Sequence, residues 1–343
     1  MFAVSQIILR NLDQHMPGGS ALWINPQADD SWRTVRTRCD SLKLFSQDYG
    51  SFTFLQQTGA ETEFSAFPAT GKEKYDWVII NLPRQKALLT MMLDCAASLL
   101  AANGKLWLAG ENRAGIKSAD KLLRLHFRQV RKLDNARHCG LYVAENRQNE
   151  DAFDPLAYRE KWDMEYADTT ISVTSYPGVF AHGRLDEGTA LLLDTLATTH
   201  LHGDVLDFAC GAGVIGSCIA AHHADTRVTL LDTSALALRA CEETLEANQL
   251  KASVLASDGL GDLAGEFDFV ISNPPIHAGV KTDNRLGMRL LDSIHGHIRT
   301  GGRFILVANI HLPYENWLST RFRSISTLAV NANKNYKIIT AKK

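Results

Sequence analysis

Apolar and polar residues alternate in regular blocks through the second half of the chain. Short apolar runs typical of buried strands occupy residues 203–208, 227–232, 252–256, 267–272 and 303–308. Helical patterns lie between them, at 214–222, at 235–248, and in a segment that we expect to end at the glycine pair Gly301-Gly302. Strands that alternate with helices predict a mostly parallel sheet covered on both faces. Residues 326–330 and 336–340 flank a polar turn and predict an antiparallel hairpin that closes this sheet.

The first half repeats part of this pattern. Residues 75–83, YDWVIINLP, resemble 267–275, FDFVISNPP, and residues 102–109 resemble 300–307. A repeat of this kind indicates two copies of one fold, here two tandem Rossmann-like α/β domains. The first strand of the first copy, 21–26, is followed by no glycine-rich turn. We therefore predict a degenerate domain over 1–150 that lacks the cofactor loop, a linker region over 151–170, and a catalytic domain over 171–343.

Length and composition agree with two domains and an ordinary globular protein. The chain has 343 residues, of which 45% are hydrophobic and 22% charged. No apolar run is long enough to span a bilayer, and the N-terminus lacks a basic leader with a cleavage site, so we expect a cytoplasmic protein without a membrane partner. Its six cysteines show no metal-binding spacing, so we expect reduced thiols and no metal.

A glycine-rich turn follows the strand predicted at 203–208. Glycine lets the backbone approach a ligand closely, and the start of the next helix offers free N–H groups. Three acids follow three successive strands: Asp207 can accept from an amine, Asp232 from ribose hydroxyls and Asp258 from an adenine amino group. The predicted cofactor site comprises Asp207, Ala209, Cys210, Gly211, Gly213, Asp232, Thr233, Asp258, Gly259 and Asn273. Because Gly211, Gly213 and Gly216 also satisfy the dinucleotide fingerprint, this pattern alone leaves a nicotinamide cofactor open.

A rigid polar corner, Asn273-Pro274-Pro275, follows the strand predicted at 267–272. Two prolines fix the backbone and leave the Pro274 carbonyl without a local donor. That carbonyl and the Asn273 side-chain oxygen can accept both N–H groups of an exocyclic amine. The nitrogen lone pair then faces a methyl carbon held in line on a sulfonium, so position and electrostatics carry the catalysis. We predict Asn273, Pro274 and Pro275 as catalytic, with Ile276 and His277 in contact with the substrate.

Together these residues resemble the motifs of class I S-adenosylmethionine-dependent amino-methyltransferases. The segments 176–180, 110–116 and 136–142 extend the resemblance, over nearly the whole chain, to the bacterial 16S ribosomal RNA guanine-N2 methyltransferases of the RsmC family. The resemblance implies two tandem methyltransferase folds with mostly parallel seven-stranded sheets, the first of them inactive. It also implies S-adenosyl-L-methionine as the cofactor, a guanine N2 amine as the target, and small-subunit ribosomal RNA or the 30S subunit as the partner.

Two positions depart from the family pattern. Ala209 stands where the family usually has glycine, and its methyl group faces the expected methionine end of the cofactor. Ile276 stands where an aromatic residue usually follows the two prolines. An aromatic ring there would stack on a flipped base, with about 1–3 kcal/mol of stabilisation. We expect Phe180 to supply a compensating surface.

Basic residues concentrate in the first half. Residues 1–150 hold 19 Lys and Arg against 15 Asp and Glu, a net charge of +4, whereas 151–343 carry −6. Lys117, Lys121, Arg124 and Arg128 are spaced 4, 3 and 4 residues apart, which predicts one basic helix face. Our hypothesis is that this cluster contacts RNA phosphates and positions the RNA for the second domain.

Three alternatives remain open on the residues alone. Another amino-methyltransferase, acting on large-subunit rRNA guanine, DNA adenine or protein glutamine, would use the same corner. A nicotinamide oxidoreductase would use the glycine turn but leaves Asn273-Pro274-Pro275 unexplained. A non-catalytic RNA-binding assembly protein is consistent with the departures at Ala209 and Ile276.

Overall fold

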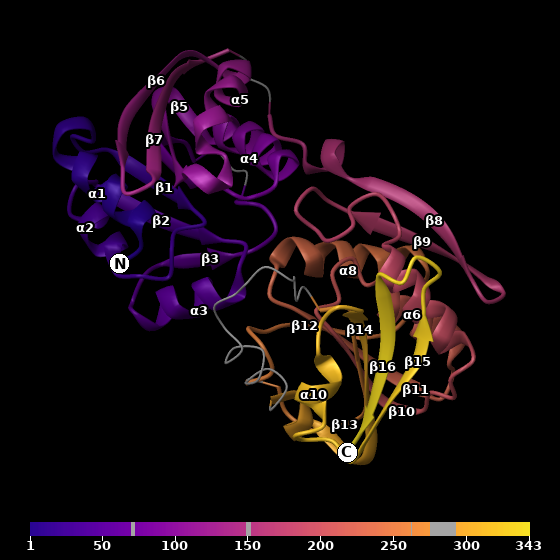
Figure 1. Ribbon diagram of the computed structural model, residues 1–343. Coiled ribbons are helices and arrows are strands. Elements are labelled where there is room, and N and C mark those ends of the chain that lie inside the picture. Colours follow the sequence, from indigo (N-terminus) through magenta and orange to yellow (C-terminus); the bar gives the residue numbers. More distant parts are fainter. Residues whose placement is uncertain (70–72, 149–151, 262, 275–292) are drawn as a thin grey trace. The chain divides into compact units, whose positions relative to one another are not determined.

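The computed structural model describes residues 1–69, 73–148, 152–261, 263–274 and 293–343 (Figure 1). The chain divides into two compact units, Met1–Arg159 and Glu160–Lys343. The border between them falls inside the range 151–170, and the second part of that range is already a strand of the C-terminal unit. None of the helices in the described ranges is long and apolar enough to cross a membrane.

The N-terminal unit is built on one seven-stranded sheet with the strand order β3-β2-β1-β4-β5-β7-β6. Its strands are β1 (Ser20–Ile24), β2 (Ser41–Ser46), β3 (Thr62–Phe64), β4 (Tyr75–Asn81), β5 (Leu100–Glu111), β6 (Phe127–Ala136) and β7 (Cys139–Arg147). Its helices are α1 (Ala3–His15), α2 (Ser31–Arg36), α3 (Tyr49–Gln57), α4 (Lys86–Leu99) and α5 (Ala119–His126), with short 3-10 turns at Asn112–Ala114, Ile116–Ser118 and Pro155–Tyr158. The first five strands of the order pair in parallel, and β7 pairs antiparallel with both β5 and β6.

The C-terminal unit repeats this topology, with the order β12-β11-β10-β13-β14-β16-β15. Its strands are β8 (Glu160–Tyr166), β9 (Thr169–Ser175), β10 (Gly203–Phe208), β11 (Thr226–Asp232), β12 (Ser253–Ala256), β13 (Phe267–Ser272), β14 (Ile298–Asn309), β15 (Ser324–Val330) and β16 (Tyr336–Lys342). Its helices are α6 (Glu187–Ala197), α7 (Val214–His222), α8 (Ala235–Ala247) and α10 (Tyr314–Leu318). Strands β8 and β9 form a separate antiparallel hairpin.

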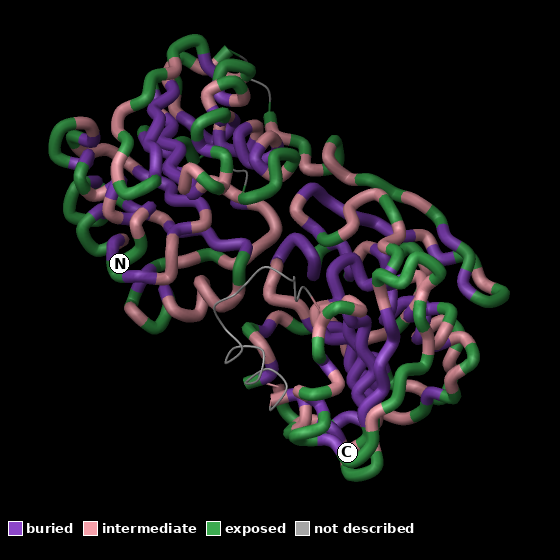
Figure 2. The backbone as a smooth tube through the Cα atoms, viewed as in Figure 1, coloured by how far each residue is buried: buried purple, intermediate pink, exposed green. Residues whose placement is uncertain are grey.

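Each sheet is the buried middle of its unit (Figure 2). Hydrophobic clusters lie on both faces of each sheet, as the continuous apolar runs of the central strands require. In the C-terminal unit, for example, Leu206 packs on one face and Val205 on the other. The repeated strand order confirms the predicted fold class, and the antiparallel pair β15–β16 confirms the predicted closing hairpin.

The helix that we expected to end at Gly301-Gly302 has its last helical residue at Gly296, so that prediction was wrong. Both glycines lie inside β14, which begins at Ile298. The pairing register of β13 with β14 shifts between Phe267 and Phe269, and Gly301 has φ +86° beside this irregularity. The glycine therefore serves a strand bulge and not a helix end, two situations that both favour a positive φ.

The single basic helix face predicted over 117–128 was also wrong. Helix α5 holds Lys121 and Arg124, but Lys117 lies in the preceding 3-10 turn and Arg128 in strand β6. The helix stops at Phe127, whose side chain is buried in the core and whose backbone pairs with Arg147 of β7. Tertiary pairing of an edge strand thus overrides the local helical spacing.

Candidate active site

The carboxyl ends of β11, β10 and β13 lie side by side in the C-terminal sheet. The chain order reverses between β10 and β13, and ligands of open α/β sheets bind at such a switch point. The glycine turn leaves β10 here, and Asn273 follows β13 directly. The buried hydroxyl of Ser272 donates to the Phe208 carbonyl at 2.6 Å and fastens these two strand ends together.

The turn after β10 has a strongly bent backbone. Ala209, Gly211 and Gly213 have φ of 60°, 55° and 77°. A Cβ on Gly213 would lie 2.7 Å from the Cys241 sulfur, so glycine is required there by both space and conformation. Ala209 adopts the same left-handed region with a side chain, which strains the backbone.

Asp207 supports the turn from inside the protein. Its side chain is 0% exposed, and its Oδ2 accepts a hydrogen bond from the Gly216 N–H at 2.8 Å. Burial, aided by the negative charge of Asp232 and opposed by that hydrogen bond, raises the pKa of Asp207 to about 7. The structure therefore makes Asp207 a support for the glycine turn; it does not line the pocket that the turn borders.

Asp232 at the end of β11 also holds the turn, and it faces the pocket. Its Oδ2 accepts from the Gly211 N–H and its Oδ1 from the Ser234 N–H, both at 2.9 Å. Asp232 thus fixes the position of Gly211 and presents its carboxylate to the pocket at the same time.

The pocket has a volume of about 430 Å³ and gathers most of the residues predicted to bind the cofactor. The predicted residues that line it are Phe180, Ala209, Gly211, Asp232, Thr233, Asp258, Gly259, Asn273 and Pro274. A smaller cavity adjoins it through Phe180, Ala209, Gly211 and Asn273, and Cys210 lines this second space. Gly213 lines neither, because its role is in the bend of the turn.

The lining of the larger pocket fits a nucleoside with an amino-acid end. Apolar side chains, including Leu231 and Ala237, line it together with the carboxylates of Asp232 and Asp258. The Ser257 hydroxyl is buried at this wall and has no hydrogen-bond partner among the described residues. An unpaired buried hydroxyl beside two acids suits a ring system with donor groups at its edge.

Asn273 is held by two residues that no local sequence pattern connects with it. Its Nδ2 donates to Asp186 Oδ2 at 3.0 Å and to Thr189 Oγ1 at 2.9 Å. Both partners lie at the start of α6, where Asp186 caps the helix by accepting from the Thr189 N–H. A capping aspartate three residues before a threonine was a visible helix-start pattern, but nothing local linked it to a residue 87 positions away.

The other predicted site residues fall into two groups. Pro275, Ile276 and His277 lie outside the described residues. Lys117, Lys121, Arg124 and Arg128 are exposed and belong to the N-terminal unit. No group of three or more His, Cys, Asp or Glu side chains suited to a metal occurs in the described ranges.

The N-terminal unit has the same backbone but no equivalent acids. Trp23 pairs with Ile79 of β4 as Asp207 pairs with Ile271 of β13, so tryptophan stands in the aspartate position. By the same registers Ser46 replaces Asp232 and Ala66 replaces Asp258.

Trp23 also changes the environment of the amide that corresponds to Asn273. The Trp23 ring is 0% exposed, and its Nε1 donates to the side-chain oxygen of Asn81 at 2.9 Å. The indole therefore fills the region of the strand ends, and its N–H is the hydrogen-bond donor to the amide oxygen of Asn81.

Comparison with known proteins agrees with this geometry. Residues 5–162 match the family model of the methyltransferase small domain N-terminal region, and residues 170–340 match that of the methyltransferase small domain. The chain is 36% identical to ribosomal RNA small subunit methyltransferase C of Shewanella amazonensis over 99% of this chain and 98% of the relative. The protein of the same name from Alteromonas mediterranea is 40% identical over 81% of this chain and 77% of its own length. The chain belongs to the ribosomal RNA small subunit methyltransferase C family.

A solved structure of this family covers the whole chain. It is the T. thermophilus 16S rRNA N2 G1207 methyltransferase (RsmC) in complex with AdoMet and guanosine. The likeness has a TM-score of 0.87 at 25% identity, over 100% of this chain and 92% of the T. thermophilus chain. The family predicted from the motifs is thereby confirmed, and membership in it argues against the alternative of a nicotinamide oxidoreductase.

The strain at Ala209 generates a first prediction. We expect Ala209→Gly to raise the free energy of unfolding by about 1 kcal/mol, because glycine adopts a positive φ without strain. The variant should also bind S-adenosylmethionine more tightly, since it removes a methyl group from the pocket wall. Urea denaturation and calorimetric titration measure the two effects.

The matched control for this variant is Ala167→Gly. Ala167 is exposed between β8 and β9 and has φ 52°. It should stabilise the protein by a similar amount and leave cofactor affinity unchanged. Equal affinities of Ala209→Gly and the unmodified protein would show that the Ala209 methyl group does not restrict the site.

The buried carboxyl of Asp207 generates a second prediction. Because its folded-state pKa, about 7, lies above the unfolded value of 3.8, the folded state holds the extra proton between these values. The contribution of Asp207 to stability is therefore fully present below about pH 4 and declines as the pH rises to 7, by at most on the order of 4 kcal/mol. The difference in unfolding free energy between the unmodified protein and Asp207→Asn should follow this decline. A difference independent of pH would contradict the raised pKa.

Proposed function

We propose that the C-terminal unit transfers a methyl group from S-adenosylmethionine to the exocyclic N2 amine of a guanine in small-subunit, 16S ribosomal RNA. The observation that carries this proposal is the hydrogen bonding of the Asn273 amide. Its Nδ2 already donates to Asp186 and Thr189, and the residue lines the pocket. The amide oxygen is thus available as an acceptor beside the glycine turn.

The residues of the corner orient the amine. The side-chain oxygen of Asn273 and the backbone carbonyl of Pro274 accept its two N–H groups, which directs the nitrogen lone pair into the pocket. When bound, S-adenosylmethionine supplies an electrophilic methyl carbon on its sulfonium. The amine loses its proton after the methyl group has arrived, so these neutral acceptors suffice without a strong base. Catalysis rests on alignment and on electrostatic complementarity.

The same pocket holds the cofactor in this proposal. Asp232 accepts from the ribose hydroxyls and Asp258 from the adenine amine, while the backbone around Ala209 and Gly211 borders the methionine end. Thr233 and Gly259 complete the wall next to the two acids. The glycines of the turn allow this close approach of backbone to ligand.

The target base must leave its helix to reach this pocket, because a paired amine is inaccessible to a methyl donor in a cleft. Phe180 is a large apolar side chain that remains 49% exposed while it lines both cavities. We propose that its ring packs against the flipped guanine, in the role that an aromatic residue at position 276 would otherwise take.

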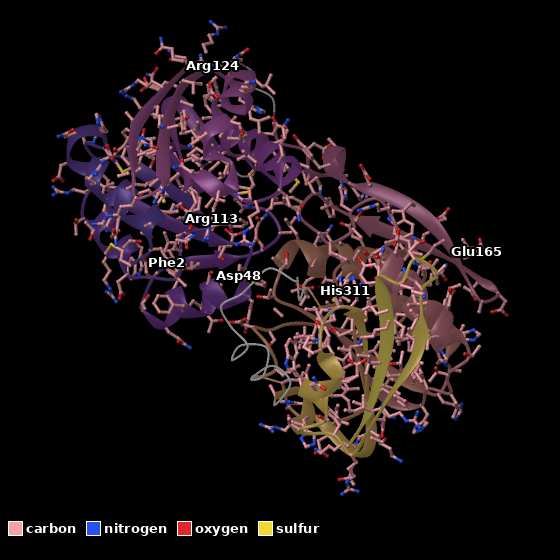
Figure 3. All side chains as sticks on the ribbon, viewed as in Figure 1. Phe2, Asp48, Arg113, Arg124, Glu165 and His311 are labelled. Carbon is pink, nitrogen blue, oxygen red and sulfur yellow. The ribbon has the colours of Figure 1, made fainter. Side chains whose placement is uncertain are left out.

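The N-terminal unit contributes phosphate contacts in this proposal. Within the described part of the chain, Lys117, Lys121 and Arg128 are exposed and form no ion pair. Arg124 also lies at the surface of this unit, as Figure 3 shows, but it pairs with Asp120 and donates to the Val130 carbonyl. The free cations are the better phosphate ligands, since Arg124 has partners of its own.

The direct test is mass mapping of rRNA methylation. The protein with S-adenosylmethionine should add one methyl group to a guanine of unmodified 16S rRNA, offered naked or within 30S subunits. Asn273→Ala should lower the rate by on the order of 100-fold or more, because an acceptor that orients the amine is lost. Transfer to neither substrate would overturn the proposal and favour a non-catalytic RNA-binding role, and transfer to a different nucleic acid or a protein would redirect it.

A further prediction concerns the ring of Phe180. We expect Phe180→Ala to raise the KM for RNA and lower kcat, with a loss of about 1–3 kcal/mol of base stacking. Phe180→Tyr keeps the ring and serves as the matched control, which should retain most of the activity. Unchanged turnover in Phe180→Ala would show that the base is held by other residues.

The cations of the N-terminal unit give the last prediction of this set. We expect the triple variant Lys117→Glu, Lys121→Glu and Arg128→Glu to bind 16S rRNA more weakly, with a salt slope reduced by about 1 for each phosphate that the protein no longer neutralises. Cofactor affinity should not change. A triple variant of the C-terminal unit, Lys251→Glu, Arg323→Glu and Lys334→Glu, alters the net charge equally and is the control. Equal RNA affinity in the two triple variants would contradict a specific role for this cluster.

A further inference from the structure

We infer that Asp186 and Thr189 are positioning residues that determine which end of the Asn273 amide faces the reacting amine. Their hydrogen bonds to Nδ2, at 3.0 and 2.9 Å, turn the amide oxygen toward the substrate. This inference rests on the proposed function and adds to it the origin of the orientation.

A carboxamide is a nearly symmetric group whose two ends have opposite chemistry. The oxygen accepts hydrogen bonds and the NH2 donates two, yet both ends have similar size. With the NH2 turned toward a guanine N2 amine, donors would face donors. Packing alone does not distinguish these two orientations, so a device that does so must use hydrogen bonds.

Asp186 supplies such a device because an ionised carboxylate only accepts hydrogen bonds. Its Oδ2 also accepts a hydrogen bond from the Thr189 N–H at 3.0 Å, which fixes its position. The Thr189 side chain is buried, and its hydroxyl lies 3.5 Å from the same oxygen. That hydroxyl donates toward Asp186, so its lone pairs are directed at the Asn273 NH2. Both N–H groups of the amide are thus satisfied on the side of the smaller adjoining cavity, which Asp186 and Thr189 line, and not in the larger pocket.

The N-terminal unit shows the same strand-end asparagine without this device. Helix α1 packs on β5, β6 and β7 as α6 packs on β14, β15 and β16, so the two helices correspond. The residue before α1 is Phe2, labelled in Figure 3, where α6 is preceded by Asp186. Asn81 has the reverse arrangement: its oxygen accepts from Trp23, and its buried Nδ2 has no partner among the described residues. The acid is therefore present in the unit that has the pocket and absent from the unit that lacks it.

The expected effect is on the rate of methyl transfer and not on ligand binding. A misoriented or rotating amide leaves the glycine turn and the acids of the pocket intact. An error of orientation at the reacting group costs up to about 100-fold in rate.

The experiment compares four variants in steady-state and single-turnover methylation of unmodified 16S rRNA or 30S subunits. Thr189→Val and Asp186→Ala each remove an acceptor, and we expect kcat to fall by about 10- to 100-fold. The Kd for S-adenosylmethionine and the KM for RNA should stay within about threefold of the unmodified protein. Thr189→Ser keeps the hydroxyl and should recover most of the rate, whereas Asp186→Asn, whose side chain also carries a donor NH2, should recover only part of it. Thr189→Val leaves the backbone cap of α6 in place, so it remains informative if Asp186→Ala fails to fold.

The control for the lost helix cap is Asp48→Ala. Asp48, labelled in Figure 3, caps α3 by accepting from the Ser51 N–H, in the unit without the pocket. It should lose stability as Asp186→Ala does, by the amount typical of a cap, and keep its full rate. An unchanged kcat in Thr189→Val would overturn the inference, and so would an equal loss of kcat in Thr189→Val and Thr189→Ser. In either case activity of the unmodified protein would still uphold the proposed function. Inactive unmodified protein would overturn the proposed function itself.

Discussion

The parallel pairing of β11, β10 and β13 is the constraint on which the site depends. Parallel strands end at the same edge of a sheet, so residues far apart in sequence meet there without any further design. The register brings Asp232 and the Gly211 backbone within hydrogen-bonding distance and places Asn273 next to the glycine turn. The tie from Ser272 to Phe208 keeps the two central ends from separating.

The two units show that this scaffold and its chemistry are separable. Strand order, parallel pairing and the closing antiparallel strands are the same in both. What differs is a small set of side chains at the strand ends, where Trp23 and Ser46 stand in place of Asp207 and Asp232. Fold is therefore maintained by the apolar positions that both copies share, and the pocket by polar positions that only one copy has.

Much of this could be predicted from the sequence because it is local. Apolar runs gave the central strands, the internal repeat gave two domains of one topology, and the motif around Gly211 with Asn273 gave the family. Residues set by tertiary pairing could not be found in this way. The helix expected through Arg128 yields to an edge strand, and Gly301 serves a bulge.

The site itself also divides into residues that local sequence reveals and residues that only tertiary contacts reveal. Most of the residues predicted to bind the cofactor line the pocket, since strand ends are visible in sequence. Asp207 was assigned to the cofactor but supports the turn from within the core, because its burial depends on packing that no local pattern shows. The contacts of Asp186 and Thr189 with Asn273 join positions 87 and 84 residues apart, so only the folded chain reveals them.

The indole of Trp23 has a consequence for how this duplication can change over time. A single substitution of Trp23 by aspartate would leave a large cavity and an uncompensated carboxylate between packed strands, a loss of about 3–5 kcal/mol for the ring alone. Such a loss approaches the whole stability of an ordinary domain. Each intermediate on a path back to an acid at this position would thus fold poorly before it gained any ligand. A pocket at the strand ends of the N-terminal copy is therefore difficult to build by single substitutions.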